Sequence, residues 1–133
     1  ASRASVRFET RLGQALPPAF ADPVQLNQAL VNVLLNGVQA MPEGGVVAVS
    51  TAATPSTVTI TVRDHGAGLP QGPVERLFEP FFTTKPGGTG LGLAVSRQIA
   101  EAHGGAIEAG NAAGGGAAIR LLFPVAPRGT DVG

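Results

Sequence analysis

The chain of 133 residues contains no cysteine, which excludes disulfides and thiolate metal sites. Its two histidines, His65 and His103, lie far apart and lack the spacing of zinc ligands. Nine basic residues balance nine acidic ones. The net charge therefore gives no reason to expect nucleic acid or an anionic membrane as a partner. What remains is a neutral chain of the size of one domain.

Three common nucleotide-binding motifs are also missing. There is no Gly-x-x-x-x-Gly-Lys-[Ser/Thr] sequence, which excludes a Walker-type site. The spacing of Gly88, Gly90 and Gly92 does not fit Gly-x-Gly-x-x-Gly, so a Rossmann dinucleotide site is not supported. The His-Arg-Asp and Asp-Phe-Gly elements of eukaryotic-type protein kinases do not occur.

The longest uncharged stretch runs from Pro23 to Pro42. It carries six side-chain amides, which are too many for a helix that faces lipid: Gln25, Asn27, Gln28, Asn32, Asn36 and Gln39. Direct insertion of this domain into a membrane is therefore not expected. Glycine and proline are frequent, but 44% of the residues are hydrophobic, which favours a folded domain over disorder.

Hydrophobic periodicity predicts an ordered mixture of strands and helices. Strands are expected over residues 4–12, 46–53, 57–64, 106–110 and 117–123. A long helix is expected to start at Pro23 with Asp22 as its N-cap and to end near Met41, and a short helical turn is expected at 74–78. A second long helix should run from Gly92 to His103, where the helix dipole favours a cation, and stop at the following two glycines. This order predicts helices on one face of a mostly antiparallel sheet, with residues 109–118 as a plain turn of small residues.

The first long helix carries a stripe of neutral amides. They recur at spacings of three and four and so share one face: Gln25, Gln28, Asn32, Asn36 and Gln39. An ordinary solvated face would carry Lys and Glu, and Asn is a mediocre helix former. Amide oxygens are hard ligands that could hold Mg²⁺ beside phosphate groups. An amide network packed against a neighbouring element is the competing interpretation.

An acidic residue, Asp64, directly follows a predicted strand and precedes Gly66 and Gly68. A carboxylate at the mouth of a pocket can accept a hydrogen bond from the exocyclic amine of adenine. Guanine presents a carbonyl at that edge, which would leave a buried acceptor unpaired at a cost of about 1–3 kcal/mol. The alternative is a polar turn after a strand, which Asp and Gly also favour.

A glycine-rich segment immediately precedes the second long helix. It contains Lys85, the only lysine of the chain, and the glycines at 88, 90 and 92. Glycines allow backbone N–H groups to approach an anion, and a helix N-terminus adds partial positive charge. The segment therefore predicts a phosphate-binding loop.

These elements, in this order, closely resemble the ATP-binding catalytic domain of bacterial two-component sensor histidine kinases. Residues 32–41 resemble the family's N box, 64–68 its G1 box, 77–85 its F box and 88–93 its G2 box. His103-Gly104-Gly105 and the closing stretch from Gly116 to Pro124 match as well. Gln39 to Met41 and Phe82 to Lys85 look most like the nitrogen-regulatory-type branch.

The resemblance implies a Bergerat-type fold, an α/β two-layer sandwich in which a mixed, mostly antiparallel five-stranded sheet packs against about three helices. It implies ATP and Mg²⁺ as cofactors. Asn36 matches the metal-liganding asparagine, Asn32 its neighbour on the phosphate side, and both match catalytic positions. Asp64 matches the carboxylate that reads adenine, with Gly66 and Gly68 beside it. The phosphate side is matched by Lys85 and by the hinge of the family's ATP lid: Gly88, Thr89, Gly90, Leu91, Gly92 and Leu93.

The resemblance also implies partners that this chain lacks. The family transfers phosphate to a histidine on a separate dimerisation domain, and neither histidine of this chain lies in such a motif. We therefore expect a catalytic domain over residues 1–124 with a disordered tail over 125–133, monomeric and cytoplasmic, with a response regulator downstream and membrane anchoring of the parent protein left open. Ala117 stands where many relatives carry Thr near the adenine, so a water-mediated contact is expected to be missing.

Asn32 also separates this chain from the chaperone and topoisomerase ATPases that share the fold. Those proteins place a glutamate at this position as a general base for water, and an amide cannot accept that proton. We therefore expect little ATP hydrolysis by the chain alone. Two alternatives to a histidine kinase remain: a serine kinase of the anti-sigma-factor type and a non-catalytic nucleotide-binding module.

Overall fold

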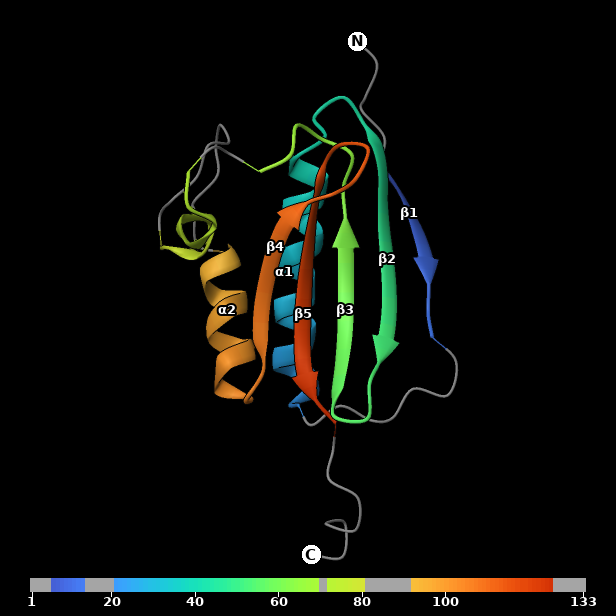
Figure 1. Ribbon diagram of the computed structural model, residues 1–133. Coiled ribbons are helices and arrows are strands. Elements are labelled where there is room, and N and C mark those ends of the chain that lie inside the picture. The colour runs from blue at the N-terminus through green and yellow to red at the C-terminus, as the bar shows by residue number, and fades with distance from the viewer. Residues whose placement is uncertain (1–5, 14–20, 70–71, 81–91, 126–133) are drawn as a thin grey trace, which may run out of the picture.

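The computed structural model describes residues 6–13, 21–69, 72–80 and 92–125 (Figure 1). Its elements are β1 (Val6–Arg11), α1 (Pro23–Gln39), β2 (Gly45–Ala53), β3 (Thr57–Arg63), η1 (Val74–Phe78), α2 (Gly92–Ala102), β4 (Ala106–Asn111) and β5 (Ala117–Pro124). The five predicted strands and the two long helices are confirmed. The count of about three helices needs a correction, because the described residues contain two α-helices, and the third helical element, η1, is a single 3-10 segment.

The strands form one mixed sheet in the order β1-β2-β3-β5-β4. β1 pairs with β2 in parallel, with α1 as the connection between them, and the other pairs are antiparallel. α1 and α2 lie together on one face of this sheet, so the domain has two layers (Figure 1). This is the predicted two-layer sandwich with a mostly antiparallel sheet.

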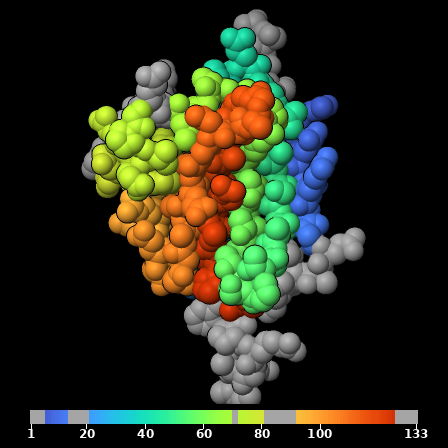
Figure 2. All heavy atoms as spheres, in the orientation of Figure 1, coloured from blue at the N-terminus to red at the C-terminus, as the bar shows by residue number. Residues whose placement is uncertain are grey.

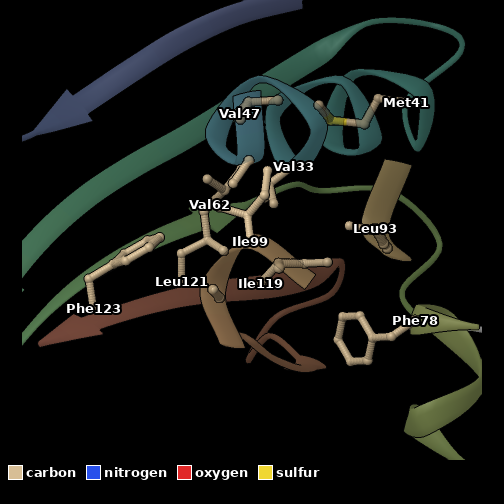
Figure 3. Close-up of a cluster of buried hydrophobic side chains, with 12 residues drawn as sticks. Val33, Met41, Val47, Val62, Phe78, Leu93, Ile99, Ile119, Leu121 and Phe123 are labelled. Carbon is tan, nitrogen blue, oxygen red and sulfur yellow. The ribbon is translucent and has the colours of Figure 1, made fainter. Parts of the chain in front are cut away.

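The core lies between the two helices and the sheet (Figure 3). Alternate residues of β5 point into it, and the side chains of Ile119, Leu121 and Phe123 are at most 2% exposed. On β3, Val58 and Val62 are buried on the same face, as the alternation of that strand predicts. The edge strand β1 contributes little, since only Val6 of its residues is partly buried.

Local sequence signals explain where α1 begins and where α2 ends. The Asp22 carboxylate accepts hydrogen bonds from the backbone N–H groups of Val24 (2.8 Å) and Gln25 (3.2 Å), which confirms the predicted N-cap of α1. α2 ends at the predicted glycine pair. Gly104 has a φ of 78°, and a Cβ on Gly105 would overlap the carbonyl oxygen of Leu122.

His103 joins the end of α2 to the start of α1. Nδ1 lies 2.7 Å from the carbonyl oxygen of Ile99, which can only accept, so Nδ1 carries the proton. Nε2 accepts a hydrogen bond from the backbone N–H of Asp22 at 3.2 Å. Both ring nitrogens are thus engaged by the backbone, one at the end of α2 and the other just before α1. The expectation of a cation at this helix end stays a prediction. The ring also packs edge-on against Phe123.

The other face of the sheet carries no helix within the described part of the chain. Figure 2 shows this face, where β2, β3, β5 and β4 lie side by side. An exposed ion pair between Arg120 and Glu108 spans two of its strands at 3.6 Å.

Val125, the first residue of the predicted tail, donates a hydrogen bond to the carbonyl of Ser56 at 2.9 Å, and the rest of that tail lies outside the described residues. Neither α-helix in the described ranges is long and apolar enough to cross a membrane.

Candidate nucleotide-binding site

Asp64 follows the last residue of β3 and is only 3% exposed. Its Oδ1 accepts hydrogen bonds from the backbone N–H groups of Gly66 (2.9 Å) and Ala117 (3.2 Å). Its own backbone N–H donates to the carbonyl of Ala117 at 2.9 Å. No hydrogen bond in the described part of the chain uses Oδ2. One carboxylate oxygen is therefore fixed by the protein, and the other is left as an oriented acceptor.

The amide stripe on α1 is divided by its surroundings. Gln25, Gln28 and Gln39 are exposed, whereas Asn32 and Asn36 are half-buried. Asn32 lies beside the start of α2, since a Cβ built on Gly92 would be 3.8 Å from the Asn32 Cβ. Of the five amides, the two asparagines are therefore the ones that are half-buried, and Asn32 lies beside the N-terminus of α2.

A buried hydrogen bond holds α1 and α2 together. The hydroxyl of Ser96, which is fully buried, donates to the carbonyl of Ala29 at 2.9 Å. Ala29 lies three residues before Asn32, and Ser96 lies four residues after Gly92. This bond therefore sets the spacing of the two helices next to the predicted phosphate side of the site.

Gly37, which the sequence analysis did not single out, lets α1 lie close to the sheet. A Cβ at this position would be 3.4 Å from the Val47 side chain and 3.8 Å from the Asp64 Cβ. The adjacent residue, Asn36, is consequently carried by the turn of α1 that lies against the end of β3. Nothing in the helical periodicity distinguishes this glycine from an ordinary small residue on an inner face.

Packing within the protein explains why glycine stands at both positions 66 and 68. A Cβ on Gly66 would overlap the carbonyl oxygen of Ala40 at the end of α1. Gly68 has a φ of 90°, and a Cβ there would be 2.7 Å from Oδ1 of Asn111. The loop is thus folded tightly between α1 and β4. Direct contact of Gly66 and Gly68 with a nucleotide stays a prediction.

Residues 109–118 are more than the plain turn expected from the sequence. Gly116 has a φ of 83°, and a Cβ on it would overlap the backbone carbonyl of Asp64. The guanidinium of Arg63 donates from Nη2 to the carbonyl oxygens of Ala113 and Gly115. The turn between β4 and β5 is therefore fastened to β3 and forms the wall that holds Asp64. The signal in the sequence was the run of glycines at 114–116, all of which have positive φ.

The phosphate side is described only in part. Gly92 begins α2, next to Asn32. Leu93 is 8% exposed and its side chain belongs to the core, so only its backbone is available to a ligand at the helix end. The other residues predicted here lie outside the described residues: Lys85, Gly88, Thr89, Gly90 and Leu91.

The donors around α1 suit Mg²⁺ held by one protein ligand and a nucleotide. No group of three or more His, Cys, Asp or Glu side chains that could hold a metal occurs among the described residues. The amide oxygen of Asn36 is a hard ligand of the kind that Mg²⁺ accepts together with phosphate oxygens and water.

A family model matches residues 21–127, which include every element from α1 to β5. It describes histidine kinase-, DNA gyrase B- and HSP90-like ATPases. This chain belongs to that family. Several relatives that match this chain are named sensor histidine kinases, as the four motifs predict.

Two curated relatives illustrate the match. Sporulation kinase C of Bacillus subtilis is 41% identical over 104 residues, which are 78% of this chain and 24% of the relative. Sensor histidine kinase ZraS of Escherichia coli O157:H7 is 41% identical over 120 residues, 90% of this chain and 26% of the relative. The chain thus spans about a quarter of the length of these proteins. The nitrogen-regulatory branch stays a prediction.

Solved structures agree with the fold and the family. The catalytic domain of the histidine kinase ThkA, in a nucleotide-free form, superposes with a TM-score of 0.81 at 30% identity and covers 92% of this chain and 82% of its own. The mycobacterial sensor histidine kinase MprB gives a TM-score of 0.75 at 34% identity, covering 92% and 83%. Full-length ShkA in complex with AMPPNP gives 0.78 at 32% identity, covering 91% of this chain and 26% of that protein.

Proposed function

We propose that this domain binds Mg-ATP and donates the γ-phosphoryl group to a histidine on a separate phosphoacceptor domain, as part of a two-component signalling protein. In this transfer the bond from the γ-phosphorus to the β,γ-bridging oxygen breaks, a bond to the imidazole nitrogen forms, and ADP leaves. The names of the relatives support this proposal, and so does the complex of ShkA with AMPPNP.

The observation that carries the proposal is the geometry of Asp64. Two backbone N–H groups hold Oδ1 and so orient the carboxylate, while Oδ2 has no hydrogen-bond partner within the described ranges. Oδ2 is then suited to accept from the exocyclic N–H₂ group of adenine. A guanine would turn a carbonyl toward the same oxygen, so the site should prefer ATP to GTP.

On the phosphate side, Asn32 and Asn36 occupy successive turns of α1, and Asn32 is beside the first residue of α2. The backbone N–H groups at the start of α2 favour a negatively charged ligand. We assign Asn36 to Mg²⁺ and Asn32 to the phosphates. When bound, the ion would balance the charge of the phosphate oxygens, while the two helices keep the triphosphate in place.

Phosphoryl transfer depends mainly on positioning and on stabilisation of charge, and an imidazole needs less activation than water. Asn32 offers no base for water, so the domain is suited to transfer rather than hydrolysis. The acceptor histidine and the response regulator would be contributed by other domains or proteins. We keep the expectation of a cytoplasmic, monomeric domain as part of the proposal.

Nucleotide titration by calorimetry tests this function directly. ATP, ADP and GTP are added to the chain with and without Mg²⁺. We expect ATP and ADP to bind, Mg²⁺ to strengthen ATP binding, and GTP to bind at least about tenfold more weakly, since 1.4 kcal/mol corresponds to a factor of ten. Equal binding of ATP and GTP would refute the role of Asp64, and no binding of either would refute the proposed function.

Transfer is tested in a second assay with radiolabelled ATP. The chain is mixed with the helical histidine domain of a relative such as ZraS, or with a serine-bearing protein antagonist of the kind used by anti-sigma-factor kinases. Label that is acid-labile and appears on the histidine domain supports the proposal. Acid-stable label on the serine protein alone would favour the serine kinase instead.

A further inference from the structure

Asn111, the last residue of β4, touches the loop that follows Asp64. Its Oδ1 accepts a hydrogen bond from the backbone N–H of Leu69 at 2.8 Å, across 42 residues of sequence. The same oxygen would be 2.7 Å from a Cβ on Gly68. Asn111 therefore closes one side of the loop from residue 65 to residue 69.

The far end of that loop is tied to Asp64 itself. The N–H of Gly66 donates to Oδ1 of Asp64 at 2.9 Å, and a Cβ on Gly66 would overlap the carbonyl of Ala40. His65, at the start of the loop, is also held, since its backbone N–H donates to Met41 Sδ at 3.4 Å and its Nδ1 lies 3.0 Å from the carbonyl oxygen of Val46. The hydrogen bond between Leu69 and Asn111 therefore holds the end of the loop that is not tied to Asp64.

The β4–β5 hairpin reaches Asp64 by a second route. The backbone of Ala117 exchanges two hydrogen bonds with Asp64, one to the carboxylate and one to the backbone. Asn111 and Ala117 are paired residues of β4 and β5, on either side of the hairpin turn. The β4–β5 hairpin thus makes hydrogen bonds both to the Asp64 carboxylate, through Ala117, and to the loop from 65 to 69, through Asn111.

We propose that Asn111 is a positioning residue for adenine recognition, which acts by holding the loop from 65 to 69 and thereby the orientation of Asp64. The proposal rests on the proposed function, because it concerns the base side of the same site. Asn111 does not touch the adenine in this account. Its effect is transmitted through Leu69 and Gly66 to Oδ1 of Asp64, which leaves Oδ2 directed at the ligand.

The test compares Asn111→Ala, which removes the acceptor, with Asn111→Asp, which keeps a side-chain oxygen at the same distance along the side chain. Thr54→Ala is the matched control. Thr54 Oγ1 accepts from the backbone N–H groups of Ser56 (3.3 Å) and Thr57 (3.0 Å) in the β2–β3 turn, at the opposite end of β3 from Asp64. All three variants and the unaltered chain are titrated with ATP and GTP, and their amide hydrogen exchange is followed.

We expect Asn111→Ala to weaken ATP binding by about fivefold to tenfold while GTP binding stays the same, because only the adenine contact is misaligned. Asn111→Asp should restore most of the ATP affinity, and Thr54→Ala should change neither nucleotide. In the nucleotide-free chain, exchange at the Leu69 amide should accelerate in Asn111→Ala and stay slow in Asn111→Asp.

The exchange measurement separates this proposal from the proposed function, since it requires no nucleotide. Fast Leu69 exchange with unchanged ATP affinity would overturn the positioning role and leave the proposed function intact. An equal loss of ATP and GTP affinity in Asn111→Ala would also overturn it, because that pattern is typical of general destabilisation. Failure of the unaltered chain to bind ATP would overturn both.

Discussion

At the scale of single residues, the candidate site is built around the Asp64 carboxylate, which two backbone N–H groups hold through one of its oxygens. Asp64 is buried, and within the described residues its carboxylate accepts from two backbone N–H groups, both at Oδ1. The proposed phosphate and metal side of the site is formed by the amides of Asn32 and Asn36 on α1, which add no charge. Five amides share one face of the predicted helix, and of these the structure half-buries the two asparagines, Asn32 and Asn36, and exposes the three glutamines.

Asp64→Asn should remove the preference for ATP over GTP. An amide keeps the size of the side chain and can still accept from Gly66 and Ala117 through its oxygen. Its NH₂ group would then face the adenine amine, donor against donor, so ATP affinity should fall at least about tenfold. Calorimetric titration of both nucleotides measures this, with Glu108→Gln on the open sheet face as the control. A preference for ATP that survives the substitution would locate adenine recognition elsewhere.

Asn36→Ala should weaken nucleotide binding only when Mg²⁺ is present. The substitution removes the proposed metal ligand, and Ala favours the helix, so the fold should be kept. Binding of ATP is compared with and without Mg²⁺. Gln39→Ala, an exposed amide three residues further along the same helix, is the matched control and should behave as the unaltered chain. An unchanged Mg²⁺ dependence in Asn36→Ala would remove Asn36 from the metal site.

At the scale of elements, the candidate site lies at the ends of helices and strands, and the core lies between their middle parts. α1 and β3 end there, α2 begins there, and the β4–β5 turn closes it (Figure 1). Close backbone approaches at Gly37, Gly66 and Gly116 bring these ends together. The glycines near Asp64 therefore serve the packing of the protein whether or not they also contact a ligand.

Gly116→Ala should destabilise the domain more than Gly115→Ala does. Both positions have positive φ, 83° and 108°, so each substitution should cost about 1–3 kcal/mol in backbone strain. A Cβ on Gly116 would also overlap the Asp64 carbonyl, whereas nothing lies within 4 Å of one on Gly115. The difference in unfolding free energy, measured with urea, isolates that overlap and should be at least about 1 kcal/mol. Equal losses would mean that the turn moves aside and does not hold Asp64.

Much of this organisation was predictable from residue patterns. The alternation in β3 and β5, the cap at Asp22 and the glycine stop at 104–105 all act locally, and all are confirmed. The role of the 109–118 turn was missed because it depends on contacts with Asp64, about fifty residues away. The contact of His103 Nε2 with the backbone N–H of Asp22, the N-cap of α1, was missed for the same reason.

At the scale of the whole molecule, the chain has the fold of a histidine kinase catalytic domain. It aligns with the catalytic domain of ThkA and covers about a quarter of curated sensor kinases. No cluster of acidic residues and histidines that could assemble a metal-dependent hydrolase occurs in the described segments.

The isolated chain should therefore hydrolyse ATP very slowly. The motif resemblance matches Asn32 to the position where the chaperone and topoisomerase ATPases carry a glutamate, and an amide does not take a proton from water. Phosphate release by the unaltered chain should be no faster than by Asn36→Ala when both are saturated with nucleotide. Rapid turnover by the unaltered chain would contradict the assignment of Asn32 to phosphate binding.

The most direct measurement of the central claim is a crystal structure of the chain with Mg²⁺ and a non-hydrolysable ATP analogue. The account predicts the exocyclic amine of adenine within hydrogen-bond distance of Asp64 Oδ2, and the metal on the amide oxygen of Asn36. A nucleotide bound elsewhere, or a base that turns away from Asp64, would contradict it.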